Sequence, residues 1–145
     1  MPVPHISRAP DAADYKSEGA RPFFAYADSG LAASTDGRFG ATFVRTVRAV
    51  RPGDGTGWHF HEAELQLIYI IHGSAVLDYE GIGRQTLKAG DLVFQPKGVR
   101  HDVVEVSADY QHLEIDMPAA FGTHPVDAPP TGLVAATPQN GESGK

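Results

Sequence analysis

Short apolar runs, separated by turns that contain glycine or proline, recur along the chain between residues 21 and 122. Within each run apolar and polar residues alternate, which is typical of strands, since successive side chains point to opposite faces. No window of ordinary helix length shows a repeat of three to four residues. The pattern therefore predicts an all-β domain over residues 21–122.

The strands follow from this alternation and from the turn residues between them. They are predicted at residues 23–26, 43–50, 58–61, 65–71, 75–79, 85–87, 92–95, 102–106 and 111–117. Many short strands with regular turns favour a sandwich or a barrel. A two-sheet jelly roll is one architecture that limits exposed sheet edges.

The two ends of the chain differ from its middle. Residues 1–20 mix Pro, Ala, Asp and Ser without periodicity, and residues 123–145 contain four prolines and a polar finish. Segments of this kind bury too little apolar surface to offset chain entropy. We therefore expect an irregular N-terminal segment over 1–20 and a flexible, proline-rich tail over 123–145.

Composition narrows the possible functions. The chain of 145 residues has a formal net charge of -6 and no basic cluster, which argues against nucleic-acid binding. It has no cysteine, so disulfides, thiolate ligands and cysteine nucleophiles are excluded. There is no run of about 18 apolar residues and no basic-then-apolar leader, so we expect a cytoplasmic protein without membrane association.

Three histidines and one glutamine are the candidate metal ligands. His59 and His61 alternate and so share one face of a predicted strand, while Gln66 and His101 follow at spacings that a small β-barrel can gather around one ion. Neutral imidazole is the commonest protein ligand for transition metals. The other histidines lack such a pattern and are predicted to be polar surface residues: His5, His72, His112 and His124.

The spacing resembles the two sequence motifs of the cupin superfamily. In this chain they read Gly53-x5-His59-x-His61-x4-Gln66-x6-Gly73 and Gly90-x5-Pro96-x-Gly98-x2-His101. The resemblance implies a double-stranded β-helix, the cupin jelly-roll barrel, with one divalent transition metal ion (Zn, Ni, Fe, Co or Cu) held by His59, His61, Gln66 and His101. Two positions depart from the family pattern: Gln66 replaces the usual glutamate, and Glu105 stands where asparagine is expected.

The position of Gln66 carries a prediction about the backbone. It lies five residues after His61, so in an unbroken strand its side chain would point away from the histidine face. Only a turn or bulge within residues 62–65 brings it to the metal, and a break is expected there. The amide oxygen is its only ligating atom, so the nitrogen needs an acceptor nearby. The alternative is that Gln66 does not bind the ion and hydrogen-bonds to one of the side chains that do.

Replacing glutamate by glutamine also changes the charge of the site. Three imidazoles and an amide are neutral, so a divalent ion keeps its +2 charge and is a stronger Lewis acid, while a ferric state is disfavoured. This favours a small metalloenzyme acting on an organic metabolite by non-redox chemistry, and the cupin resemblance implies a cyclase or an isomerase. Two alternatives stay open: a metal-dependent dioxygenase, and a non-catalytic protein that binds or senses a small molecule.

No catalytic residue can be assigned from the sequence. Polar or amphipathic residues on predicted strands or strand ends are candidates for the barrel mouth, where a small molecule would bind: Tyr79, Gln95, Arg100 and His112. The resemblance also implies a homodimer, and the aromatic strand at residues 23–26 suits such a contact. The alternative is that these aromatic side chains cap the monomer's own core.

Overall fold

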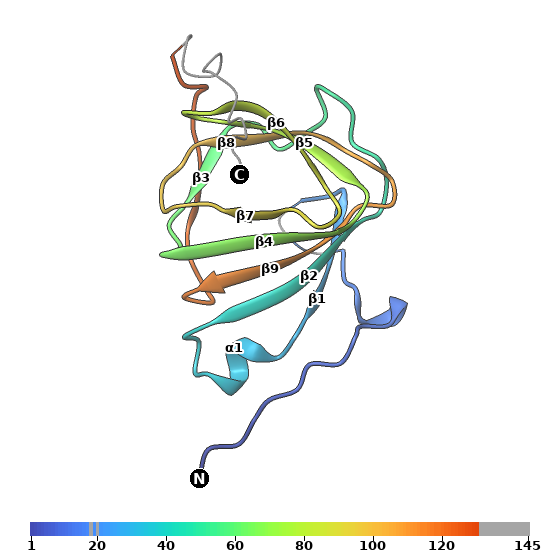
Figure 1. Ribbon diagram of the computed structural model, residues 1–145, viewed down its shortest axis with the longest axis vertical. Coiled ribbons are helices and arrows are strands. Elements are labelled where there is room, and N and C mark those ends of the chain that lie inside the picture. The colour runs from blue at the N-terminus through green and yellow to red at the C-terminus, as the bar shows by residue number, and fades with distance from the viewer. Residues whose placement is uncertain (18, 20, 131–145) are drawn as a thin grey trace.

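The computed structural model describes residues 1–17, 19 and 21–130, and its regular structure is almost entirely β (Figure 1). The strands are β1 (Phe24–Asp28), β2 (Gly40–Thr46), β3 (His59–His61), β4 (Leu65–His72), β5 (Ser74–Tyr79), β6 (Gly83–Lys88), β7 (Leu92–Phe94), β8 (His101–Val106), β9 (Gln111–Met117) and β10 (Thr123–Pro125). The short helices are η1 (Ala12–Asp14) and α1 (Leu31–Ser34). Neither helix of this described part is long and apolar enough to span a bilayer.

The strands form two five-stranded antiparallel sheets that face each other across the interior. Their orders are β1-β2-β9-β4-β7 and β10-β3-β8-β5-β6, and they lie in the lower and upper parts of Figure 1. From β3 to β9 the chain repeatedly crosses between the sheets, with β4, β7 and β9 in one and β3, β5, β6 and β8 in the other. This is the arrangement of a double-stranded β-helix, so the all-β jelly-roll prediction is confirmed.

Apolar side chains from both inner faces fill part of the barrel. Val44 and Ile70, from the first sheet, are among the most deeply buried, and Leu77, from the second, packs in the same cluster. Phe23 and Phe24 also belong to it and are only 2% and 7% exposed. These two rings therefore cap the chain's own core, as the alternative interpretation expected, and a contact between copies would have to use other residues.

The predicted break between the two ligand-bearing strands is confirmed. β3 ends at His61 and β4 begins at Leu65, and the residues between them carry the chain from one sheet to the other. The Glu62 N–H donates to the Gly122 carbonyl (2.9 Å), and the Glu64 N–H donates to a carbonyl at the end of β9 (2.7 Å). These bonds hold a crossing that lets position 66 face the interior.

Two boundaries differ from the sequence prediction. The strand expected at 43–50 ends at Thr46, and Val50 keeps only an isolated bridge to Val106. Residues 123–125, assigned to a flexible tail, form β10 and pair with β3. Main-chain hydrogen bonding orders this exposed strand, which a composition argument based on side-chain burial does not detect. Residues 131–145 of the predicted tail lie outside the described residues.

Candidate metal centre

The two sequence motifs meet where β3 pairs with β8. His59 lies directly opposite His101 in the register, and His61 is two residues further along the same face of β3. One ring nitrogen from each histidine lies within 4.8 Å of the others. Gly98 helps to join the motifs, because its N–H donates to the His61 carbonyl (3.0 Å) from a backbone with φ of +83°, which glycine adopts without strain.

All three imidazoles use their Nδ1 atoms for hydrogen bonds to the protein. His59 Nδ1 bonds the Gly57 carbonyl (2.8 Å), and His101 Nδ1 bonds the Val99 carbonyl (3.1 Å). His61 Nδ1 bonds Thr123 Oγ1 (2.7 Å), a contact that β10 provides. A carbonyl can only accept, so the proton of His59 and of His101 is on Nδ1 and their Nε2 atoms keep free lone pairs.

Burial keeps these imidazoles neutral. It lowers the pKa of His59, and together with the neighbouring His59 it lowers the pKa of His61 to about 4. The pKa of His101 is lowered to about 3, again mainly by burial and then by His59. Neutral imidazole is the form that binds a metal, so no proton must be displaced at neutral pH. The tautomers, charge state and proximity of the three rings fit a divalent transition metal ion.

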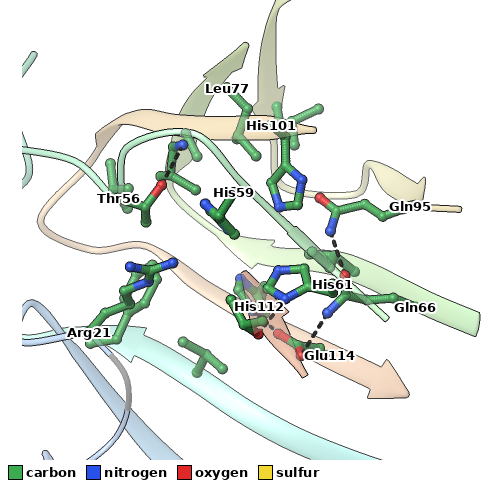
Figure 2. A pocket seen from close by; sticks show the side chains of 18 of the residues that line it. Arg21, Thr56, His59, His61, Gln66, Leu77, Gln95, His101, His112 and Glu114 are labelled. Carbon is green, nitrogen blue, oxygen red and sulfur yellow. Dashed lines mark hydrogen bonds and ion pairs between the residues drawn. The ribbon is translucent and has the colours of Figure 1, made fainter. Parts of the chain in front are cut away.

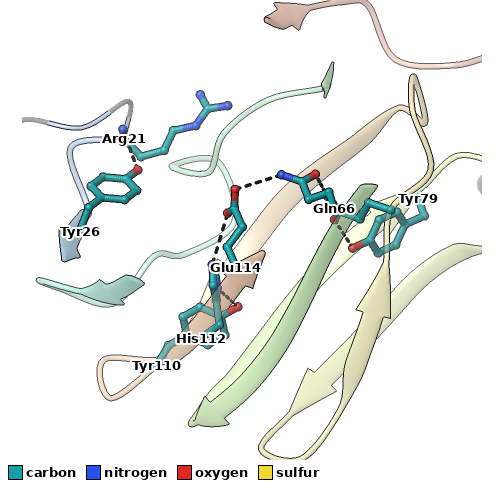
Figure 3. A network of polar contacts seen from close by, with 8 residues as sticks. Arg21, Tyr26, Gln66, Tyr79, Tyr110, His112 and Glu114 are labelled. Carbon is teal, nitrogen blue, oxygen red and sulfur yellow. Dashed lines mark hydrogen bonds and ion pairs between the residues drawn. The ribbon is translucent and has the colours of Figure 1, made fainter. Parts of the chain in front are cut away.

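Gln66 lies on the inner face of β4, within a chain of side-chain hydrogen bonds (Figure 3). Tyr79 Oη donates to Gln95 Oε1 (2.6 Å), Gln95 Nε2 donates to Gln66 Oε1 (2.6 Å), and Gln66 Nε2 donates to Glu114 Oε2 (3.1 Å). Glu114 is thus the acceptor that the amide nitrogen was expected to need. A carbonyl oxygen has two lone pairs, so Gln66 Oε1 keeps one beyond its bond to Gln95.

The inner face of β9 carries three polar residues in succession: His112, Glu114 and Asp116. His112 Nδ1 bonds Tyr110 Oη (2.6 Å), while its Nε2 is buried without a hydrogen-bond partner among the described residues and lies 3.6 Å from Glu114 Oε1. Burial and then the charge of Glu114 raise the pKa of Asp116 well above its ordinary range. Glu114 is therefore the ionised carboxylate of this pair and Asp116 the protonated one.

The three histidines of the triad and Gln66, together with His112 and Glu114 of β9, line one cavity of about 190 Å³ (Figure 2). Much of the remaining wall is apolar and includes Phe24, Leu77, Val103 and Phe121. An engineered apolar cavity of about 150 Å³ binds benzene, so this space suits a ring-sized organic molecule. The site thus combines a histidine triad that could hold a metal ion with a small, largely apolar chamber.

The structure separates the residues proposed for the barrel mouth. Gln95 and His112 line the cavity, Tyr79 lies behind Gln95, and Arg100 is outside, 3.8 Å from a Glu80 carboxylate oxygen. The prediction that His112 is a surface residue is wrong, since it is only 6% exposed. Its inward direction follows from the parity of β9, which a single histidine in an isolated strand does not reveal.

Fold and site together define a small all-β protein with a buried tris-histidine centre. The family model of the cupin domain matches residues 46–111, which contain both motifs and the whole triad. This part of the chain is therefore similar to a cupin domain. No curated protein matches the sequence.

Several solved structures share the fold. They include the polyketide cyclase RemF from Streptomyces resistomycificus (TM-score 0.60, 20% identity, covering 89% of this chain and 90% of that one) and KdgF from Halomonas sp. (0.57, 20%, 72% and 87%). A cupin-like protein from Thermotoga maritima msb8 is similar to the same degree (0.57, 19%, 86% and 95%). At this identity the similarity establishes the fold, and function has to be argued from the site.

Proposed function

We propose that the protein is a metal-dependent enzyme that uses one divalent transition metal ion as a Lewis acid on a small organic metabolite, in a cyclase- or isomerase-type reaction. The observation that supports this is the set of three neutral imidazoles that face a ring-sized cavity. The uncharged Gln66 lines the same cavity and stands where the family motif has an acidic ligand. We propose Gln66 as the fourth ligand, through the second lone pair of Oε1.

The protein groups around the ion have distinct parts in such a reaction. When bound, the ion polarises a carbonyl or enolate oxygen of the substrate. The Nδ1 hydrogen bonds hold the imidazoles in place, and the apolar wall limits the access of water to the reacting groups. Glu114 is the carboxylate on the cavity wall, and we propose that its Oε1 accepts the proton removed from the substrate.

The test begins with the metal. Protein purified without a chelator or a metal-affinity tag is analysed for bound metals and then assayed against enolisable and phenolic metabolites. We expect turnover by the metal-loaded protein that chelation abolishes and zinc restores. If the protein contains iron and consumes oxygen during turnover, the alternative of a metal-dependent dioxygenase would replace this proposal. Metal-loaded protein that binds metabolites and converts none would leave a binding or sensing protein.

We also propose that the protein forms a homodimer through the outer face of the sheet β1-β2-β9-β4-β7. Large apolar side chains are exposed there: Tyr69 at 46%, Leu92 at 65% and Phe94 at 55%. Tyr69 and Leu92 are directly paired across β4 and β7, and Leu67 pairs with Phe94 beside them. A contiguous exposed apolar surface of this kind is typical of a protein–protein contact.

A further inference from the structure

We propose that Arg21 is the anchor for a carboxylate, so that the substrate is an organic monocarboxylic acid whose apolar, ring-sized body occupies the cavity. This inference rests on the proposed function only in taking the same cavity as the active site. Arg21 belongs to neither of the two sequence motifs. It lies just before β1, well before the triad in the sequence.

The backbone at Arg21 is fixed while its side chain is directed inward. Its N–H donates to Tyr26 Oη (3.2 Å), and its carbonyl accepts from the Phe24 N–H (3.2 Å). The side chain extends from this position into the cavity toward the histidines, as Figure 2 shows. Fixing the backbone at Arg21 keeps the guanidinium within reach of the cavity before a ligand arrives, which reduces the entropy lost on binding.

The guanidinium faces the cavity without a protein counter-ion. Within residues 1–17, 19 and 21–130 it forms no ion pair, and Glu114, the acid that lines the same cavity, bonds Gln66. Arg21 and the three histidines line the same cavity, so the guanidinium and the triad face one chamber. A cation on a largely apolar wall favours an anionic ligand, and guanidinium matches carboxylate geometry with two parallel hydrogen bonds.

The rest of the cavity restricts what the acid can be. Its volume of about 190 Å³ accommodates one ring with small substituents. Glu114 adds a negative charge to the wall beside Gln66, so a second carboxylate at that end would be repelled. The ligand that fits these restrictions has one carboxylate at Arg21 and an apolar body in the cavity. It also has a neutral oxygen function directed toward the histidines.

Benzoate and benzamide provide a matched pair of probes, since they have the same shape and differ in charge. Each is titrated by calorimetry into the full-length protein, both zinc-loaded and stripped of metal with EDTA. We expect benzoate to bind about tenfold to a hundredfold more tightly than benzamide in both forms, as a charge-assisted hydrogen bond contributes on this scale. Arg21→Gln should reduce the preference to less than about threefold. Arg45→Gln, whose guanidinium lies 4.0 Å from the Tyr15 ring and outside the cavity, should keep it.

The metal-free titration separates this inference from the proposed function. A preference for benzoate that appears only with zinc and survives Arg21→Gln would show that the metal binds the anion, which overturns the role of Arg21 and leaves the metalloenzyme intact. Equal binding of both probes by metal-free protein, or binding of neither, also overturns it. A preference that depends on Arg21 in a protein that retains no metal would support the anchor and contradict the proposed function. Unfolding temperatures measured in parallel confirm that each variant is folded.

Discussion

Gln66→Glu provides the sharpest test of the metal site, because the new carboxylate would face an existing one. Gln66 Nε2 lies 3.1 Å from Glu114 Oε2, and the substitution places an oxygen where that nitrogen was. Two unit charges at this distance repel by about 5 kcal/mol at an effective dielectric constant of about 20. Since one pKa unit corresponds to about 1.4 kcal/mol, the pKa of residue 66 should rise by roughly 4 units, to about 8.

In the metal-free variant the new carboxyl is therefore protonated at pH 6 and donates to Glu114, as the amide does in the wild type. A metal ion that residue 66 binds must displace this proton. We expect zinc binding at about pH 6 to release close to one proton in Gln66→Glu, and close to none in the wild type, whose imidazoles are already neutral. Calorimetric titrations in buffers of different ionisation enthalpy measure the number of protons released per zinc ion bound.

The double variant Gln66→Glu/Glu114→Gln is the matched control. Without the charge at position 114, the carboxyl of residue 66 is less protonated, so proton release on zinc binding should fall below that of the single variant. Equal release by wild type and Gln66→Glu would mean that residue 66 does not contact the ion. Equal release by the single and double variants would refute the repulsion from which the magnitude was calculated.

Four further outcomes are expected. His101→Ala should weaken zinc binding by more than about 100-fold, measured by competition with a chromophoric chelator, since even the loss of a hydrogen-bond partner of a ligand costs up to that factor. Glu114→Gln should retain full metal content but lose about 100-fold or more of its turnover, while Glu105→Gln, on an exposed position of β8, should match the wild type in both assays. The unfolding free energy of the metal-free protein should decrease as the pH falls below about 6.5, because the unfolded chain then binds protons that the buried His61 and His101 exclude; denaturant titrations should show a loss of about 3 kcal/mol at pH 4 from His101 alone. Phe94→Asp should convert a dimer to a monomer by light scattering, and a wild type that is already monomeric would contradict the outer-face contact.

Local spacing was sufficient to predict that the three histidines lie together and that the chain breaks and crosses between the sheets after His61. His59 and His61 are two positions apart and so share one face of a strand. Gln66 is five positions after His61, and this odd separation required a break, which the structure has at residues 62–64. These are statements about parity, and parity is fixed by the geometry of a strand. The residues that orient the triad were not predicted. Thr123 reaches His61 only because β10 pairs with β3, a contact over 62 residues of sequence.

The two sheets contribute different residues to the cavity, and these residues differ in how readily they can be predicted from the sequence. β3 and β8 provide the three histidines that could bind a metal ion, and the short spacing of His59 and His61 forms a recognisable motif. β9 provides His112 and Glu114, which alternate with apolar residues as in any half-buried strand. Their place in the site becomes evident only when the opposite sheet, with the three histidines, is known. The Nδ1 partners of the triad lie outside β9, so substitutions on β9 can change the polarity of the chamber without removing these bonds. Under the function proposed above, the groups that decide which reaction takes place therefore lie on β9, opposite the triad, together with Arg21.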